Sequence, residues 1–527
     1  MVTLQMNNVT CDNKIEPHRR LRGESVLYSP NIVQHERDGV CLIIDPASPN
    51  WASSNRLGSA IIRSCDAKHT LHEVAERTSL EYGLPVQVIA DFIEQAAQAG
   101  FVSESPDVSP AYGGRASVIA PSALEELWIY TNNSCPLRCR HCLVEGGEES
   151  ASTMSADEIK KLVDDAAALG AGRIYFTGGE PFLRGDILEL AEYVTARTQL
   201  VILTSGVLIT DGLAAKLSLL SHGNLTIQVS LEGPDAETSD AIRGAGSFAR
   251  AVRGIKSLIH AGIVPVVTTT LTRLNYMKAP ETTRFLACLG VRDHHILWLH
   301  QCGRMRTSNA ELILSGEEIA RTMERLRAAA REAGIVVDNL ESLAARIKGR
   351  GHKNDLCNSC YGVLAVGTEG HVYPCASLVG RPEFDCGSAK DEGLKRIWLD
   401  SPKTSWVRCN SVQKKVGCSS CYLKFFCGGG CFAQSYFNYE VATGSGCIMA
   451  PDPYCEVYRS QLLETMWQSA MPPETARTEE SPVIYKVMDA KLPGCAGGNY
   501  TTLNAAHDVG TYHCSCVLAM DVPRDGG

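Results

Sequence analysis

The sequence predicts an α/β fold in which parallel strands form a barrel or an open sheet. Two observations support this class. Strand-like and helix-like segments alternate between residues 125 and 299, which is typical of repeated βα units. The apolar fraction of 44% and the charged fraction of 21% are those of a globular protein. At 527 residues the chain is too long for one hydrophobic core, so we expect several domains.

The first 20 residues are polar and are expected to form a loose N-terminus. Residues 21–104 predict a small module with two strands followed by three helices. The strand pair covers residues 25–28 and 39–44, the helices cover residues 55–65, 70–82 and 86–100, and residues 101–102 can begin a closing strand. This order is typical of a winged-helix module, whose strand edge can pair with an extended peptide. DNA binding and a purely structural role are the alternatives, and the net charge of −9 disfavours DNA.

Residues 105–122 contain several Pro, Gly and Ser residues and predict a linker. The alternating region follows over residues 123–345. Its predicted strands are residues 125–131, 173–177, 200–204, 225–231, 264–271 and 295–299, and its predicted helices are residues 155–169, 187–197, 213–219, 248–261 and 280–289. In such folds the functional residues gather at the carboxyl ends of the strands.

Three cysteines directly follow the first of these strands. Cys135, Cys139 and Cys142 lie within eight residues, so one loop can wrap a single metal group. A four-iron cluster takes four ligands, usually cysteines, and three leave one iron open to another molecule. A zinc site without a nearby fourth ligand is the alternative.

The next strand ends in a glycine-rich turn, Gly178-Gly179-Glu180-Pro181. Consecutive glycines let the backbone approach a ligand closely, and the Glu180 carboxylate can accept from an ammonium group. Ser230 and Glu232 lie at a later strand end, where a hydroxyl and a carboxylate suit a ribose. Arg243 suits a ligand carboxylate, with a surface helix charge as the alternative.

The cysteine trio and the glycine-rich turn together resemble the radical S-adenosylmethionine superfamily over residues 123–300. The resemblance implies a partial (β/α)6 TIM-type barrel, with a [4Fe–4S] cluster held by the trio. S-adenosylmethionine would bind the open iron through its amino and carboxyl groups, with the turn at its amine. One-electron cleavage would then give a 5′-deoxyadenosyl radical that abstracts hydrogen from a substrate. Leu143 departs from the pattern, because many members have an aromatic residue there.

A second set of cysteines crowds residues 346–460. Two tetrahedral zinc sites could use it, but the spacing resembles the SPASM auxiliary-cluster domain. That resemblance implies one auxiliary iron–sulfur cluster on Cys357, Cys360, Cys375 and Cys431. It implies another on Cys418, Cys421, Cys427 and Cys455, the last of which matches the family better than Cys447. Cys386 and Cys409 fit no ligand position and are expected to be structural.

Residues 21–103 resemble the PqqD-like leader-recognition domain of enzymes that modify ribosomally made peptides. The combined resemblance implies a peptide maturase that forms a thioether or carbon–carbon crosslink, with an external electron donor such as flavodoxin or ferredoxin. The alternatives are a sulfatase-maturase-like oxidase of Cys or Ser, a haem-precursor enzyme, and a non-catalytic leader-binding scaffold. Ala376 disfavours the sulfatase-maturase type, which has an Asp at that position.

Other features bound the protein's partners and location. The sequence has no run of Lys or Arg dense enough to suggest nucleic acid, and no apolar stretch of roughly 20 residues that could span a membrane. Without a signal peptide at the N-terminus, a cytoplasmic location is expected. The C-terminal extension, residues 461–527, carries Cys495, Cys514 and Cys516. Its end could be a substrate-like peptide, a metal clip or, as we expect, a packing or lid segment.

Overall fold

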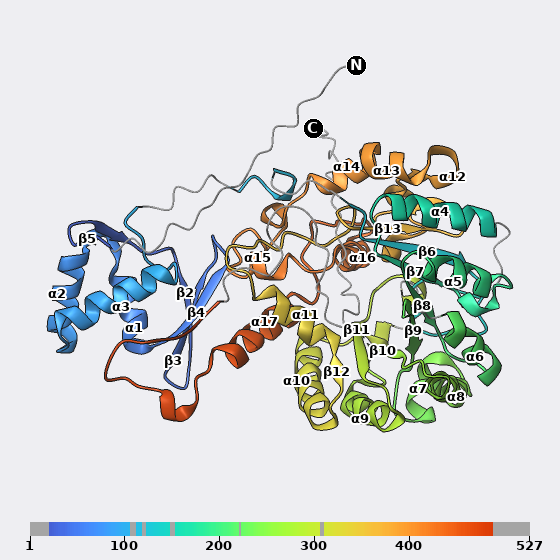
Figure 1. Cartoon of the computed structure of the whole chain (residues 1–527), viewed down its shortest axis with the longest axis horizontal. Helices are drawn as coiled ribbons and strands as arrows, with labels where there is room; N and C mark the ends of the chain where they lie inside the picture. Colours follow the sequence, from blue (N-terminus) through green and yellow to red (C-terminus); the bar gives the residue numbers. More distant parts are fainter. Residues whose placement is uncertain are drawn as a thin grey trace, which may run out of the picture. The chain divides into compact units, whose positions relative to one another are not determined.

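The computed structural model describes residues 21–105, 112–117, 123–147, 153–220, 223–305 and 310–488. These form two compact units, shown in Figure 1. Unit 1 contains the N-terminal module and residues 469–488, and unit 2 contains the described residues from Tyr112 to Gln468. The predicted loose N-terminus, most of the predicted linker and the cysteines at 495, 514 and 516 lie outside the described residues. No described helix has the length and apolar character needed to cross a membrane.

Unit 2 is built on a ten-stranded sheet in the order β12-β11-β10-β9-β8-β7-β6-β13-β14-β15. Strands β6 to β11 are parallel, and each pairs with the next in sequence. These six are β6 (Glu126–Asn132), β7 (Arg173–Gly178), β8 (Gln199–Thr204), β9 (Leu225–Ser230), β10 (Val266–Leu271) and β11 (Asp293–Trp298). The predicted α/β class and partial barrel are therefore confirmed.

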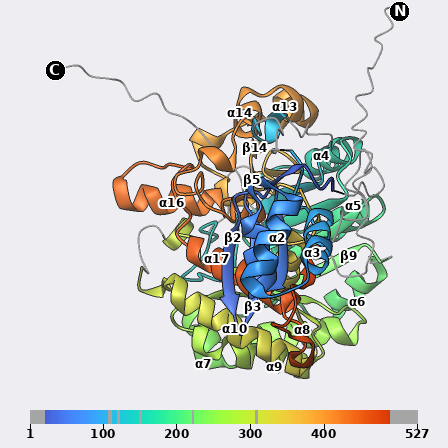
Figure 2. The same ribbon diagram turned by 90° about the vertical axis from the view of Figure 1, so that its left-hand side faces the viewer.

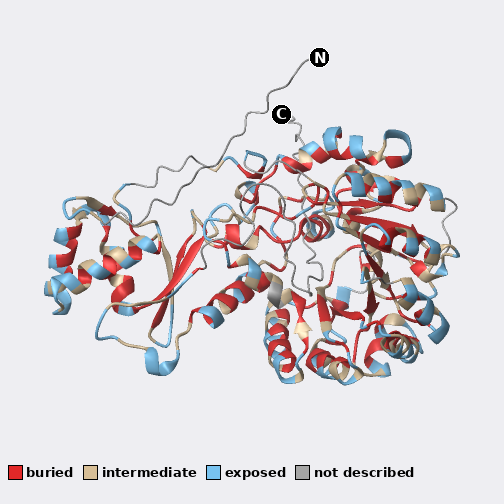
Figure 3. Ribbon diagram, viewed as in Figure 1, coloured by how far each residue is buried: buried red, intermediate tan, exposed pale blue. Residues whose placement is uncertain are grey.

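Helices cover the outer side of these strands (Figure 1). They are α4 (Ala156–Ala168), α5 (Ile187–Thr195), α6 (Asp211–Leu220), α7 (Ala236–Arg243), α8 (Ser247–His260), α9 (Ala279–Leu289), α10 (Gly316–Ala333) and α11 (Asp338–Arg346). Figure 3 shows that the strands are largely buried and that the helices expose their outer faces. Helix α4 begins with a capping box, in which Ser155 and Glu158 each accept the other's backbone N–H.

The cysteine-rich segment continues the same sheet. Strand β13 (Val363–Val366) pairs in parallel with β6, and β14 (His371–Tyr373) and β15 (Gly387–Ser388) add antiparallel strands. Short helices follow, namely α12 (Ala389–Glu392), α13 (Leu394–Asp400), α14 (Pro402–Arg408), α15 (Lys424–Cys427), α16 (Phe432–Thr443) and α17 (Cys455–Ala470). Because the hydrophobic core of unit 2 includes residues from both segments, they form one folded body.

Unit 1 has three helices at the predicted positions, α1 (Arg56–Ser64), α2 (Leu71–Tyr82) and α3 (Val86–Gln98). Helices α2 and α3 pack side by side (Figure 2). The predicted strand pair is wrong in its partners, because β1 (Val26–Tyr28) pairs with β5 (Asp66–Thr70). No strand forms at residues 101–102, and only Ser103 makes an isolated bridge to Tyr28.

A separate antiparallel sheet in unit 1 has the order β16-β4-β3-β2. Its strands are β2 (Val33–Arg37), β3 (Val40–Asp45), β4 (Asn50–Asn55) and β16 (Ile484–Val487). The predicted segment 39–44 is thus the inner strand β3 of this sheet. The fourth strand comes from a segment about 430 residues away in sequence, a distance that no local pattern could reveal.

Candidate active site

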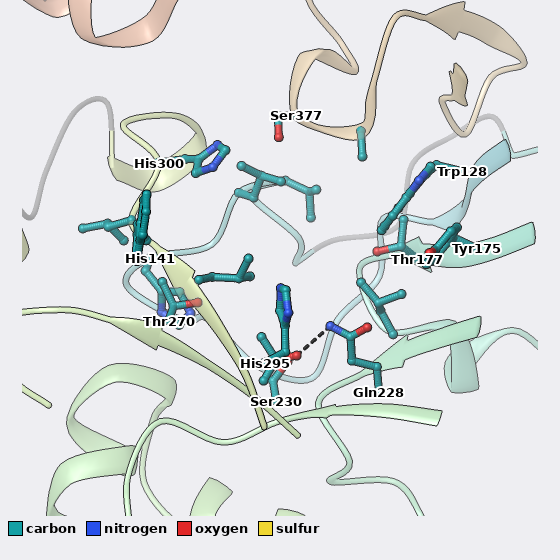
Figure 4. Close-up of a pocket in the computed structure, with 18 of the residues that line it drawn as sticks. Trp128, His141, Tyr175, Thr177, Gln228, Ser230, Thr270, His295, His300 and Ser377 are labelled. Carbon is teal, nitrogen blue, oxygen red and sulfur yellow. Dashed lines mark hydrogen bonds between the residues drawn. The ribbon is translucent and has the colours of Figure 1, made fainter. Parts of the chain in front are cut away.

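A cavity of about 360 Å³ lies inside the partial barrel of unit 2. Side chains alternate along a strand, so every second residue faces this space. Most barrels fill it with branched aliphatic residues, but here many of the inward residues are polar or aromatic. These are Trp128, Tyr130, Tyr175, Thr177, Gln228, Ser230, Thr268, Thr270 and His295. In Figure 4, Trp128 and Tyr175 lie on one side of the space and His141 and His300 on the other.

The predicted cluster loop contributes all three of its cysteines to the wall of this cavity. Cys139 is buried, and Cys135 and Cys142 are partly exposed. Burial raises the pKa of the Cys135 thiol to about 11. The loop returns on itself through a hydrogen bond from the Cys135 N–H to the Gly147 carbonyl, 3.3 Å long. The structure therefore brings the predicted trio together at the carboxyl end of β6.

Arg304, which sequence reasoning missed, holds this loop from a distant position. Its guanidinium donates to the Cys139 carbonyl at 3.1 Å and to the Gly146 carbonyl, and its backbone N–H donates to the Cys142 carbonyl at 3.1 Å. The preceding Gly303 has a φ of 58°, and a Cβ there would lie 2.2 Å from the Cys142 carbonyl oxygen. The one available signal was the Gly-Arg dipeptide just beyond the last predicted strand.

The glycine-rich turn packs directly against the start of the cluster loop. A Cβ on Gly178 would lie 2.2 Å from the Asn132 carbonyl oxygen, and one on Gly179 would lie 2.1 Å from the Ser134 carbonyl oxygen. The Gly179 N–H donates to the Asn132 carbonyl oxygen at 2.8 Å. Both glycines also line the cavity. Two side chains here would push the turn and the loop apart, so glycine is required at both positions.

The Glu180 carboxylate is fully buried behind the turn. It accepts from the Thr204 hydroxyl at 2.7 Å and from the backbone N–H of Ser205 at 2.9 Å. Pro181 begins a short 3-10 helix, Pro181–Leu183. The backbone of Gly178 and Gly179 thus forms the cavity-facing surface of the turn. A contact between Glu180 and a ligand ammonium stays a prediction.

Glu232 and Arg243 form a buried ion pair. The guanidinium donates to one Glu232 oxygen from two nitrogens, at 2.9 and 2.7 Å, and a third nitrogen lies 3.8 Å from the Cys139 sulfur. The Nε2 atom of His141 lies 3.2 Å from the same Glu232 oxygen. The Thr270 N–H donates to the other Glu232 oxygen at 2.8 Å. Burial by itself raises the pKa of Glu232, but Arg243 and His141 outweigh it and bring this pKa to about 2.

Of the residues predicted for the ribose and carboxylate, Ser230 and Arg243 line the cavity, whereas Glu232 is 0% exposed. The structure thus gives Glu232 a clear internal task, which is to fix the Arg243 guanidinium beside the cluster loop. The ribose contact of Glu232 stays a prediction.

Four of the predicted auxiliary ligands act on one another electrostatically. Burial raises the pKa of the Cys418 thiol to about 12, and Cys427, Cys455 and Cys421 add to this rise against the opposing effect of Lys415. Cys421 likewise raises the pKa of Cys455, after burial. The fold therefore gathers these four thiols, with Cys455 among them.

The other predicted auxiliary set, Cys357, Cys360, Cys375 and Cys431, is buried in the core of unit 2. Two buried arginines hold its backbone. Arg115 donates to the Cys357 carbonyl at 2.6 Å, and Arg408 donates to the Cys360 carbonyl at 2.6 Å. Cys375 and Cys431 line the same cavity as the trio.

The turn between Cys427 and Cys431 consists of three glycines with φ of 71°, 82° and 75°. A Cβ on Gly430 would lie 2.4 Å from a carboxylate oxygen of Asp452. Asp452 accepts the Cys431 N–H at 2.6 Å and the Tyr454 N–H at 2.7 Å. Asp452 thus ties Cys431 to the segment that carries Cys455.

The donor sets fit iron–sulfur clusters in their chemistry. No described cysteine forms a disulfide, and thiolates are the ligands that such clusters use. Among the described residues, no three His, Cys, Asp or Glu side chains lie close enough together to hold a single metal ion. A four-iron cluster binds each thiolate at a different iron, so its ligands lie farther apart than those of one ion.

Comparisons with known proteins agree with this geometry. The model of the radical SAM superfamily matches residues 129–286, and the SPASM model, an iron–sulfur cluster-binding domain, matches residues 357–422. An AdoMet-dependent heme synthase from Nitratidesulfovibrio vulgaris is 30% identical over 62% of this chain and 90% of its own length. The mycofactocin maturase MftC from Mycolicibacterium smegmatis is 29% identical over 67% of this chain and 89% of its own length.

The crystal structure of Streptococcus suis SuiB bound to precursor peptide SuiA superposes with a TM-score of 0.52. The superposition covers 79% of this chain and 96% of the SuiB chain at 15% sequence identity, which shows a shared fold. The family's cofactors are S-adenosylmethionine and [4Fe–4S] clusters, one of which binds S-adenosylmethionine. The chain is an enzyme of the radical SAM superfamily and carries a SPASM iron–sulfur domain.

Proposed function

We propose that this enzyme modifies a ribosomally synthesised precursor peptide by hydrogen abstraction followed by formation of a thioether or carbon–carbon crosslink. The observation that carries the proposal is the single cavity whose wall contains both the cysteine trio and two auxiliary cysteines, Cys375 and Cys431. A substrate in this space would lie within reach of both cysteine regions. The maturase MftC among the relatives supports a peptide as the substrate.

Each group of residues has a task in this proposal. The trio would hold the [4Fe–4S] cluster, and Gly178 and Gly179 would offer backbone to the methionyl part of S-adenosylmethionine. When bound, the cluster and S-adenosylmethionine supply a 5′-deoxyadenosyl radical. Arg243, fixed by Glu232, keeps a positive charge beside Cys139. The auxiliary set Cys357, Cys360, Cys375 and Cys431 would hold one further cluster and the set Cys418, Cys421, Cys427 and Cys455 another.

The cavity wall offers two features for a substrate side chain. Trp128 and Tyr175 stack with their ring centroids 3.9 Å apart and form a flat apolar surface. The polar groups of the wall include His295, whose Nδ1 hydrogen-bonds to the Asp338 carboxylate. An Asp partner on one ring nitrogen fixes the tautomer and directs the other nitrogen away from the carboxylate. His295 is therefore the candidate proton acceptor in this cavity.

A haem-precursor enzyme is the second candidate, because the AdoMet-dependent heme synthase is a relative at 30% identity. A tetrapyrrole substrate carries several carboxylates, which need cationic partners. Arg243 is a cation of the cavity wall, and its charge is already paired with Glu232. The barrel cavity thus favours a peptide over a polycarboxylate.

The proposal is tested by incubating the reconstituted enzyme with S-adenosylmethionine, a flavodoxin or ferredoxin donor, and a candidate precursor peptide. We expect 5′-deoxyadenosine together with a peptide product that has lost about two hydrogens, the mass change of one crosslink. A tetrapyrrole precursor in the parallel reaction should remain unchanged. Decarboxylation of the tetrapyrrole without any change in the peptide would replace the first candidate with the second.

A further inference from the structure

Strand β4 of unit 1 is fully buried although most of its side chains are polar. Asn50 is 3% exposed, and Ser53, Ser54 and Asn55 are 0% exposed. One edge of β4 pairs with β3, and the other edge pairs with β16, which lies near the C-terminal end of the described residues. A polar strand of this kind is stable in a core only when its groups find hydrogen-bond partners.

The C-terminal segment 478–488 supplies partners for Ser54 and Asn55, whereas Ser53 donates to the Ala470 carbonyl and Asn50 to the Ala99 carbonyl. The Asn55 side-chain amide donates to the Thr478 carbonyl at 2.8 Å and to the Ser481 carbonyl at 2.7 Å. The Ser54 hydroxyl donates to the Val483 carbonyl at 2.6 Å. The β4 side chains thus bind main-chain carbonyls, which every extended peptide carries, rather than particular side chains. This is the chemistry of a strand-docking edge.

Two apolar contacts anchor the ends of the docked strand. Ile484 packs against the hydrophobic core of unit 1. Met488 is 2% exposed, and its N–H donates to the Trp51 carbonyl at 2.8 Å. Val487 lies between them in the sequence, and its side chain is 39% exposed and therefore not buried as theirs are. The docked strand therefore buries two apolar residues that lie four positions apart.

The segment also carries an acidic pair that lies in the same depression as two basic residues of the module. Glu479 and Glu480 line a depression together with Arg56 and Arg63. Glu479 adds to the raised pKa of Arg56, after the larger effect of Glu36. A partner of this edge would thus be acidic at its start and apolar four and eight positions beyond Glu480.

We propose that residues 478–488 occupy, within the same chain, the docking edge for the leader of the peptide substrate. An incoming leader with this acidic and apolar pattern would have to exchange with the chain's own strand before it could bind β4. The inference rests on the proposed function only for the identity of the incoming peptide, because strand exchange itself needs neither cluster nor S-adenosylmethionine.

The test measures binding of a fluorescein-labelled peptide with the sequence of residues 478–488 to three full-length proteins by anisotropy. These are the unaltered chain, Ile484→Asp, which buries a charge and releases the strand, and Val487→Asp as the matched control on the same strand. If the edge is closed in nine of ten molecules, releasing it strengthens the apparent affinity about tenfold. We expect this gain for Ile484→Asp alone. Equal affinities for all three proteins would overturn the proposal.

Hydrogen exchange supplies a second readout, in which the amides of Asn50–Asn55 should exchange faster in Ile484→Asp and slow again when the peptide is added. If Ile484→Asp does not fold, a protease site is inserted at the exposed residues 474–476. Cleavage there separates residues 478–488 from the rest of the chain and leaves every docking side chain intact. The labelled peptide should then exchange into the cut protein, and failure to do so counts against the proposal. Formation of 5′-deoxyadenosine is measured separately in each protein, so loss of the radical chemistry is distinguishable from loss of docking.

Discussion

The cluster trio and the auxiliary cysteines are the same type of ligand, but the chain brings them together in two different ways. Cys135, Cys139 and Cys142 lie on one eight-residue loop that opens onto the barrel cavity. The auxiliary cysteines come from residues 357 to 455 and depend on the fold to meet. A site that must admit a second molecule benefits from an open loop with a missing ligand, whereas a closed site can collect its ligands from distant segments. The first three of the five predictions below test this difference.

The largest effect is expected from the trio. Replacing Cys142 with Ala removes one of the three thiols of the trio and leaves two predicted ligands on the loop. We expect formation of 5′-deoxyadenosine to vanish and the iron content to fall by about four atoms per chain, the size of one cluster. Cys288→Ala, an exposed cysteine on α9, is the control. Unchanged activity in Cys142→Ala would show that the trio is not the reactive site.

The auxiliary set should respond differently. Cys455→Ala removes a thiol that raises the pKa of Cys418, and we expect loss of about four irons together with loss of the peptide product. Cleavage of S-adenosylmethionine should persist, because the trio is untouched. Cys447→Ala is the matched control and should retain all iron. The opposite pattern would make Cys447 the ligand, and iron analysis with electron paramagnetic resonance decides between them.

Arg304 tests whether the open loop needs support from outside. Arg304→Gln removes the guanidinium hydrogen bonds to the Cys139 and Gly146 carbonyls. Loss of such outer contacts at metal sites costs about 10- to 100-fold in metal affinity or activity. We expect faster loss of iron to a chelator, with folding unchanged. Arg253→Gln, on the exposed side of α8, should behave like the unaltered chain, and similar chelator rates in both variants would leave Arg304 without a role.

Two adjacent histidines of β11 give the smallest and most local test. His295 faces the cavity, whereas His294 faces outward and contacts Thr283 at 3.1 Å and Thr269 at 2.9 Å. We expect His295→Gln to lower the turnover of the peptide more than its KM and to leave cleavage of S-adenosylmethionine intact. The same substitution at His294 should leave turnover near normal. Equal effects of both substitutions on turnover would remove His295 from the chemistry.

We expect His294 instead to affect the stability of the folded protein at acidic pH. Burial, with His295 adding to it, lowers the pKa of His294 from 6.5 to about 3. In the unfolded chain His294 is therefore protonated near pH 6.5, whereas in the folded chain it stays neutral down to about pH 3. Stability then falls as the pH drops through this window, by up to about 1.4 kcal/mol per pH unit. His294→Gln should flatten this limb in thermal melts recorded from pH 7 to pH 4.

The sequence predicted the six parallel strands and five of the helices of the barrel because each carries its own signal, but it did not predict α7, α10 and α11. Strand β7 was expected at residues 173–177 and lies at Arg173–Gly178, and α4 begins at the predicted capping box of Ser155 and Glu158. The trio and the glycine-rich turn were found from the sequence because both are short motifs, and the structure places both at the wall of one cavity, whereas their roles stay predictions. Arg304 was not predicted, because its contacts join residues about 165 positions apart.

By itself, the sequence determined the elements and motifs whose residues are close together in the chain: the helices, the parallel strands, the trio and the turn. Only the tertiary structure decided which distant groups meet. Strand β4 has too many polar residues to be recognised as a buried strand, and its hydrogen bonds are completed by a segment about 430 residues later. Burial and hydrogen bonding depend on what a residue packs against, and that partner is fixed only when the whole chain has folded.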